Sequence, residues 1–220
     1  MTDQPLLGVS ILWDLDGTLL DSYEEIVSGV QEVCRSFGIE TERKAIEYEV
    51  KSASVSAFFR TFSEKTGIPA KTLKQRYEEE EHRRRINIPI FEGAEETLKE
   101  LSSLGAKHYV YSHRGSSSFD ILRRTGILPA FAEIITAEDG FARKPAGDAV
   151  LYLVEKYGMD KRQTYYVGDR TIDMNCAENA GIPGILFLPL GSVVTPDGTE
   201  TCIIRHLRDL RGLLLQKKSS

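Results

Sequence analysis

An apolar run that ends in two carboxylates constrains the fold of this chain more than any other stretch. Residues 9–13 read as a buried strand, Asp14 and Asp16 follow it, and Gly17 and Thr18 then require a sharp turn. Side chains alternate along a strand, so acids spaced by two begin on the same side. Because desolvated like charges repel, either a bound cation or a division of labour between the acids has to resolve the conflict. The alternative is a polar strand end followed by a glycine turn.

The composition is that of an ordinary globular chain. Of its 220 residues, 41% are hydrophobic and 28% are charged, which allows one large core, or one core and a small inserted domain. The net charge of −5 argues against nucleic acid as a partner. Three cysteines, Cys34, Cys176 and Cys202, are scattered without metal-type spacing, which favours a reducing compartment. With no apolar run of membrane-spanning length and no signal-peptide pattern, a cytoplasmic location is expected.

A helical block follows the first strand. Helices are predicted over residues 22–37, 42–50, 55–65 and 69–88, the last of them long and highly charged. The small and polar segment 51–56 is predicted to be a loop or the start of a helix, with the loop at residues 51–54. Alternation of strands and helices resumes only near Pro89, so the block is expected to be an insertion.

Strands and helices alternate through the rest of the chain. The predicted strands are 107–111, 133–136, 164–167 and 184–188, and the predicted helices are 94–104, 116–125, 146–157, 171–180 and 207–216. This pattern predicts an α/β fold, with a doubly wound, Rossmann-like parallel sheet and helices on both of its faces. Ligands of such sheets bind outside the carboxyl ends of the strands, so functional residues are expected there.

Polar residues follow four of the predicted strands, or lie in the loop after one. They are Asp14 and Asp16; Ser112, His113 and Arg114; Lys144; and Asp169 and Asp173. Phosphoryl transfer needs this set: a carboxylate nucleophile, a second carboxyl group to move protons, and a divalent cation held by oxygen ligands. It also needs fixed donors for the phosphoryl oxygens. The combination is much more specific than any one member.

Taken one at a time, these residues have ordinary structural explanations. Ser112 could cap a helix, and Lys144 could be a surface lysine. Asp169 and Asp173 could cap the helix that follows them.

Two motifs resemble those of the haloacid dehalogenase superfamily. The first is Asp-x-Asp-Gly-Thr at residues 14–18, and the second is Gly-Asp-x-x-x-Asp-Met-x-x-Ala-x-x-Ala-Gly at residues 168–181. Ser112 and the Lys144-Pro145 pair occupy the places of the two motifs between them. The resemblance covers residues 8–20 and 89–205. The first motif is most similar to the phosphoglycolate phosphatase and β-phosphoglucomutase branch, which carries a helical cap.

The resemblance implies a role for each of these residues in phosphoryl transfer. Asp14 corresponds to the nucleophile and Asp16 to the general acid and base. Ser112 and Lys144 correspond to the groups that bind phosphate, and the backbone N–H of His113 is expected to face it. The family often has Asn-Lys after the Ser or Thr, so Ser-His-Arg is a variant, which leaves open whether the His113 and Arg114 side chains contact substrate.

The resemblance also implies Mg²⁺ as the cofactor. Asp14, the backbone carbonyl of Asp16, and Asp169 correspond to its ligands, and Asp173 to an acid that orients the water on the metal. The core domain is expected to comprise residues 1–21 and 89–220, and the cap domain residues 22–88. Lys51 and Ser52 are the candidates for the cap's substrate loop.

The expected function is a Mg²⁺-dependent phosphatase that hydrolyses a small phosphate monoester, phosphoglycolate-like or a sugar phosphate, through an aspartyl-phosphate. The expected partner is a small phosphorylated metabolite, with no nucleic acid or membrane, and the chain is expected to be a monomer or homodimer. One alternative is a phosphomutase of the β-phosphoglucomutase kind, which a basic group such as Lys51 keeps open. Another is a non-catalytic phosphate-binding regulatory protein, against which the complete set of acids argues. Dehalogenases of this fold generally lack the second acid, Asp16.

Overall fold

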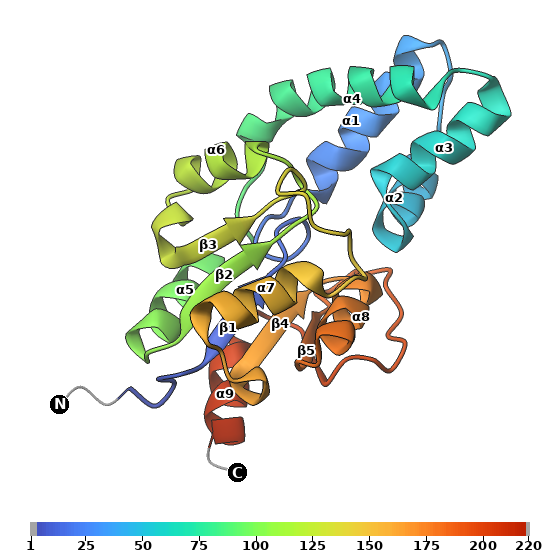
Figure 1. Cartoon of the computed structure of the whole chain (residues 1–220). Coiled ribbons are helices and arrows are strands. Elements are labelled where there is room, and N and C mark those ends of the chain that lie inside the picture. The colour runs from blue at the N-terminus through green and yellow to red at the C-terminus, as the bar shows by residue number, and fades with distance from the viewer. Residues whose placement is uncertain (1–3, 219–220) are drawn as a thin grey trace. The chain divides into compact units, whose positions relative to one another are not determined.

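The computed structural model describes residues 4–218, and the chain falls into two compact units (Figure 1). The first unit ends at Leu20 and resumes at Ile90, and the second is Asp21–Pro89. The second unit is therefore one residue longer at each end than the predicted insertion, residues 22–88. Residues 1–3 and 219–220, the ends of the predicted core domain, lie outside the described residues.

Within the described residues, the strands of the first unit form one six-stranded sheet of order β3-β2-β1-β4-β5-β6. All neighbouring strands are parallel. The strands are β1 (Ser10–Trp13), β2 (Lys107–Tyr111), β3 (Phe131–Ile135), β4 (Thr164–Gly168), β5 (Gly184–Phe187) and β6 (Cys202–Ile204). Strand β1 is buried along its whole length, as a central strand covered on both faces must be.

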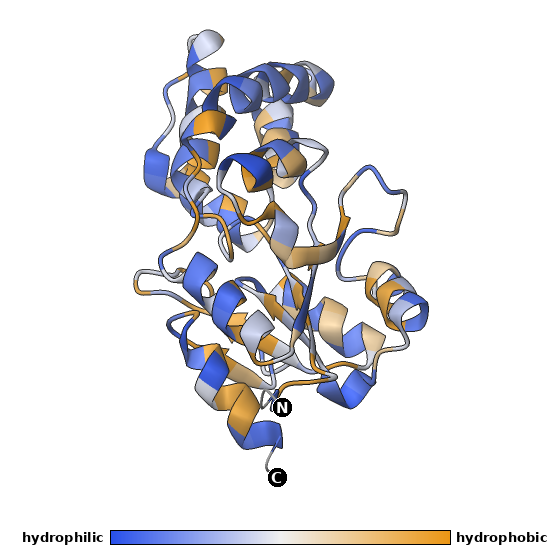
Figure 2. Ribbon diagram, turned by 90° about the vertical axis from the view of Figure 1, so that its left-hand side faces the viewer, coloured by the Kyte–Doolittle hydropathy of each residue, from blue (hydrophilic) through white to orange (hydrophobic). Residues whose placement is uncertain are grey.

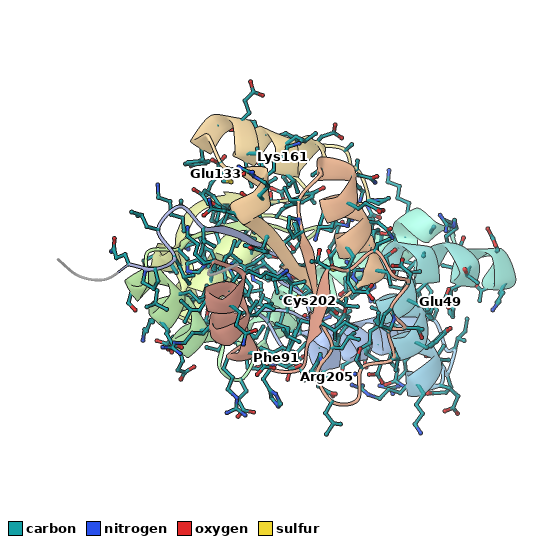
Figure 3. All side chains as sticks on the ribbon, turned by 90° about the horizontal axis from the view of Figure 1, so that it is seen from below. Glu49, Phe91, Glu133, Lys161, Cys202 and Arg205 are labelled. Carbon is teal, nitrogen blue, oxygen red and sulfur yellow. The ribbon has the colours of Figure 1, made fainter. Side chains whose placement is uncertain are left out.

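Helices cover both faces of this sheet. Helices α7 and α8 lie side by side on one face and α5 and α9 on the other, as Figures 1 and 3 show. Figure 2 shows helices with mixed hydrophobic and hydrophilic segments, which is typical of amphipathic helices that bury one side. The helices of this unit are α5 (Ala94–Ser103), α6 (Ser117–Arg124), α7 (Asp148–Tyr157), α8 (Thr171–Ala180) and α9 (Asp209–Lys218), with 3-10 turns at Leu128–Ala130 and Lys161–Gln163. The predicted doubly wound α/β fold is confirmed.

The edge strand β6 was not predicted. Its three residues, Cys202 to Ile204, pair with β5, and Cys202 is labelled in Figure 3. A segment this short carries no measurable alternation of apolar and polar residues, so only the neighbouring strand identifies it.

The second unit is a bundle of four helices within Asp21–Pro89. They are α1 (Tyr23–Ser36), α2 (Arg43–Ser52), α3 (Val55–Thr66) and α4 (Ala70–Arg84), and a 3-10 turn follows at Arg85–Asn87. Its separate core contains the three phenylalanines of α3, Phe58, Phe59 and Phe62, packed with apolar residues of the other helices. The segment predicted as one helix over residues 69–88 thus changes to a 3-10 turn in its last residues.

The prediction of a loop at residues 51–54 is wrong for its first two residues. Lys51 and Ser52 form the last turn of α2, because neither glycine nor proline stops the helix earlier and both side chains bond within it. Lys51 Nζ lies 2.6 Å from Glu47 Oε1, and Ser52 Oγ donates to the Tyr48 carbonyl at 2.6 Å. Only two residues, 53 and 54, separate α2 from α3.

Between residues 4 and 218, no helix combines the length and the apolar character that crossing a membrane requires.

A buried hydrogen bond joins the neighbouring strands β1 and β2 just before the first carboxylate. Trp13 Nε1 donates to His108 Nδ1 at 3.1 Å, and His108 is 1% exposed. Burial lowers the pKa of His108 from 6.5 to about 4, because the protonated imidazole loses its hydration in the core. The imidazole is therefore neutral in the folded protein near pH 7.

We expect His108 to make the fold less stable in mild acid. Above pH 6.5 the imidazole is neutral in both the folded and unfolded states. As the pH falls towards 4, only the unfolded chain takes up the proton, so the free energy of unfolding should drop by roughly 2 kcal/mol between pH 7 and 5. Urea denaturation of the wild type and His108→Gln across this range measures the effect. A constant difference between the two proteins at all pH values would contradict it.

Candidate active site

The polar residues that follow β1, β2 and β4 lie at the point where the strand order reverses. From β1 the chain continues to β2 and β3 on one side, and then to β4, β5 and β6 on the other. Ligands of doubly wound sheets bind in the crevice at such a switch point. Asp14 directly follows β1, Ser112 follows β2, and Asp169 follows β4.

A tight turn after β1 separates the first two acids. Asp14 N–H still bonds the Val167 carbonyl at 2.9 Å, which extends the pairing of β1 with β4. Gly17 has a φ of +84°, in the left-handed region that side chains disfavour, and its N–H bonds the Leu20 carbonyl at 2.8 Å. The Leu15 carbonyl also accepts from the N–H of Leu20, so the turn begins after Asp14, which stays paired with β4, and Asp16 lies within the turn.

Lys144 lies between two buried carboxylates. Its Nζ is 2.5 Å from Asp14 Oδ1 and 2.7 Å from Asp173 Oδ1, and all three side chains are essentially inaccessible to solvent. Lys144 comes from the loop between β3 and α7, whereas Asp173 is the third residue of α8. The faces of Tyr111 and Tyr166 also lie 5.1 Å from Nζ, within the range of a cation–π interaction.

Burial and pairing act on the ionisation of this cluster. Burial raises the pKa of Asp14, Lys144 opposes this effect, and the charge of Asp173 adds to it. Burial alone would lower the pKa of Lys144, but the two carboxylates outweigh it and raise that pKa. Lys144 is therefore a permanent cation in the folded protein.

Three carboxylates could share a cation at this edge. One oxygen each of Asp14, Asp169 and Asp173 lies within 4.8 Å of the others, and all three residues are buried. Asp14 Oδ2 has no hydrogen-bond partner among the described residues, a costly state for a buried carboxylate oxygen. Carboxylate oxygens suit Mg²⁺, so the donor set fits the metal.

Asp173 differs from Asp14 because both of its oxygens are bonded. Oδ1 accepts from Lys144 Nζ, and Oδ2 accepts from the Arg170 N–H at 3.1 Å. This arrangement makes it a weaker candidate for direct metal ligation than Asp14.

Arg114 holds the second acid of the opening motif. Its Nε donates to both oxygens of Asp16 at 3.1 Å, and its Nη2 donates to Asp16 Oδ1 at 2.7 Å. The Arg114 side chain is 6% exposed and that of Asp16 is 23% exposed, so the pair is partly shielded from water. The sequence left the role of Arg114 open, because nothing local to Ser-His-Arg indicates a partner 98 residues away.

The two residues before Arg114 make different contacts. Ser112 is 1% exposed, and its Oγ accepts from the Arg114 N–H at 3.1 Å. His113 Nε2 accepts from the Lys144 backbone N–H at 2.8 Å. The imidazole contact was not predicted either, and it links the end of β2 to the Lys144 loop.

The first unit thus supplies every predicted residue of the core site. The two rings beside Lys144 were missed, although a signal was present. Tyr111 and Tyr166 lie in His-Tyr-Val-Tyr (108–111) and Tyr-Tyr-Val-Gly (165–168), two segments predicted as strands that end at the site. Lys51 and Ser52, the candidates for the substrate loop, belong to the second unit.

Comparison with known proteins places this site in a family. Residues 11–187 match the family model for haloacid dehalogenase-like hydrolases. A phosphoglycolate phosphatase from Agrobacterium fabrum is 30% identical over 193 residues, covering 84% of this chain and 82% of that protein. A pyrophosphatase, PpaX from Bacillus pumilus, is 26% identical over 176 residues, covering 78% of this chain and 79% of that protein.

A solved structure shares the fold. It is a predicted phosphoglycolate phosphatase from Haemophilus somnus, with a TM-score of 0.83 and 19% identity, over 94% of this chain and 98% of that one. The chain belongs to the haloacid dehalogenase-like hydrolases. The predicted family is confirmed, and with it the assignment of the chain as an enzyme, a hydrolase whose relatives include phosphatases.

Gly168 is required by the packing of Asp173. A Cβ at position 168 would lie 2.4 Å from Asp173 Cβ and 2.5 Å from its Cγ. We expect Gly168→Ala to displace Asp173 and lower the free energy of unfolding by about 1–3 kcal/mol, the usual cost of overpacking. Gly212, in α9, faces open space, and Gly212→Ala should instead raise stability by about 0.5–1 kcal/mol. Denaturant unfolding of both variants tests the difference, and equal stability of Gly168→Ala and wild type would contradict it.

Proposed function

We propose that this hydrolase is a Mg²⁺-dependent phosphatase that hydrolyses a small phosphate monoester through an aspartyl-phosphate on Asp14. The observation that carries the proposal is the contact of Asp14 Oδ1 with Lys144, while Oδ2 of the same buried carboxylate has no hydrogen-bond partner among the described residues. A nucleophile needs this combination of a fixed orientation and an available oxygen.

In the first half of the reaction, an Asp14 oxygen attacks phosphorus. A bond forms between that oxygen and phosphorus, the ester P–O bond breaks, and the leaving oxygen takes a proton from Asp16. In the second half, water attacks the aspartyl-phosphate and gives its proton to Asp16, which frees Asp14 and inorganic phosphate. Arg114 orients the Asp16 carboxylate, so Asp16 must loosen at least one of its bonds to Arg114 to reach the leaving oxygen.

Lys144 and Ser112 are proposed to hold the phosphoryl oxygens. Lys144 is a buried cation in contact with the proposed nucleophile, so it can screen the repulsion between a carboxylate and an incoming phosphate dianion. Ser112 is buried at the end of β2 and carries a hydroxyl that can donate to a phosphoryl oxygen. The backbone N–H of His113 is proposed as a further donor.

The metal would be held by Asp14, Asp169 and the backbone carbonyl of Asp16, and Asp173 would orient its water. When bound, Mg²⁺ supplies positive charge that screens the phosphoryl group from the attacking carboxylate.

The substrate is proposed to be a small phosphorylated metabolite, phosphoglycolate or a sugar phosphate. The similarity to the phosphoglycolate phosphatase of Agrobacterium fabrum supports this class, while fold alone does not choose the substrate. The helical unit is proposed as the cap that contacts it, in a cytoplasmic monomer or homodimer. Lys51, which kept the mutase alternative open, has its ammonium group paired with Glu47.

Asp14→Asn should remove the activity. Wild type and variant are compared on a panel of phosphate monoesters with Mg²⁺, including phosphoglycolate and hexose phosphates. Because the amide cannot form the acyl phosphate, we expect kcat to fall by at least about 1,000-fold. Asp120→Asn, the same change at an exposed acid of α6, should leave it unchanged. Equal turnover by Asp14→Asn and wild type, or no turnover of any ester by wild type, would refute the proposed function.

Mg²⁺ should stabilise the folded protein through the acidic cluster. The three buried carboxylates of Asp14, Asp169 and Asp173 repel one another less when the ion binds, so the thermal midpoint should rise with Mg²⁺ concentration. Asp169→Asn should abolish the rise, and Asp120→Asn should not. Thermal melts with Mg²⁺ or with EDTA measure it without any substrate. The same rise in Asp169→Asn as in wild type would exclude Asp169 as a ligand.

A further inference from the structure

The loop that carries Lys144 is held by side chains rather than by secondary structure. It lies between β3 and α7, and four of its backbone polar groups bond to side chains from elsewhere. The pairs are the Ala142 carbonyl with Tyr111 Oη (2.9 Å), the Lys144 N–H with His113 Nε2 (2.8 Å), the Pro145 carbonyl with Asn179 Nδ2 (2.9 Å) and the Ala146 carbonyl with Cys176 Sγ (3.1 Å). An irregular segment keeps one conformation only when its surroundings determine it in this way.

Two of these four side chains flank Ser112. Tyr111 is the last residue of β2, and His113 follows the serine. Their rings lie edge to face with centroids 6.0 Å apart. At the end of β2, the residues on either side of Ser112 each make a hydrogen bond to the backbone of the Lys144 loop, and we call these two side chains the clamps.

Tyr111 and His113 contact the Lys144 loop at different points. Tyr111 binds the loop two residues earlier and lies beside the ammonium group as a ring. His113 binds the backbone N–H of the lysine residue, so it fixes the point from which the side chain starts. A shift of that point moves Nζ away from Asp14 and Asp173, which it contacts at 2.5 and 2.7 Å.

We propose that His113 is a positioning residue, whose Nε2 fixes Lys144 against Asp14 and ties it to the neighbouring phosphate-binding Ser112. The proposal rests on the proposed function for its effect on turnover, while the clamp itself is independent of it. What the position requires is a hydrogen-bond acceptor at the reach of Nε2, not a group that exchanges protons with substrate.

The state of the imidazole agrees with this role. Burial, together with the charges of Lys144 and Arg143, lowers the pKa of His113 from 6.5 to about 3. The imidazole is therefore neutral near pH 7, and its contact with the Lys144 N–H assigns Nε2 as the nitrogen that accepts. A histidine intended to transfer protons would have a pKa near the working pH instead.

Two amide substitutions at position 113 distinguish the position of the hydrogen-bond acceptor from the identity of the imidazole ring. Gln carries its acceptor oxygen about as far from the backbone as Nε2, whereas Asn ends one bond short. We expect His113→Asn to lower kcat/KM for the best phosphate monoester by roughly 10- to 100-fold, since small misplacements of catalytic groups cost up to about 100-fold. His113→Gln should stay within a few-fold of wild type. His206→Asn, the same change at an exposed histidine, is the control.

A second measurement follows the clamp without turnover. Hydrogen exchange at the Lys144 amide should be faster in His113→Asn than in wild type, and close to wild type in His113→Gln. Thermal melts establish that each variant is folded. If wild type turns over no ester, the proposed function fails, and hydrogen exchange at the Lys144 amide alone then tests whether His113 fixes the loop. Equal activity and exchange in all three proteins, or equal losses in both variants, would overturn the positioning role.

Discussion

The buried contact of Lys144 with Asp14 and Asp173 is the interaction on which the site depends. Removing three charged side chains from water carries a large penalty, and mutual attraction offsets it only when the geometry is tight. Both contacts lie within 2.7 Å. Without the lysine, two carboxylates would face each other in a medium of low dielectric constant. Neighbouring features follow from this requirement, including the absence of a side chain at Gly168 and the fixed loop after β3.

Arg114 meets the same requirement for the other acid of the opening motif. Asp14 and Asp16 are two residues apart and would repel each other on one side of a strand. Asp16 lies in the turn that begins at Leu15, and each acid pairs with a different cation, Asp14 with Lys144 and Asp16 with Arg114. Two separate cations therefore offset the two charges within the protein itself. The lysine pair is wholly buried, and the arginine pair is partly open to solvent.

The sheet explains why these groups meet. In a parallel sheet all carboxyl ends lie at one edge, and the strand order reverses beside β1, the place where ligands of such sheets bind. Asp14, Ser112 and Asp169 each follow a different strand. The loop of Lys144 has no such support of its own, so side chains from β2 and α8 hold it. The position of Lys144 therefore depends on side chains from other elements.

The sequence by itself determined the doubly wound α/β fold, the helical insertion and the identity of the polar residues at the strand ends. These follow from apolar periodicity, glycine turns and short motifs, which act over a few residues. Tertiary structure alone decided which cation pairs with which acid, because the partners in the Lys144–Asp14 and Arg114–Asp16 pairs are 130 and 98 residues apart in sequence. It likewise decided that Lys51 lies in the last turn of a helix, that the Cys202 segment is a strand and that His113 accepts a hydrogen bond from the Lys144 loop. Contacts between distant segments depend on register and packing, and no local pattern encodes them.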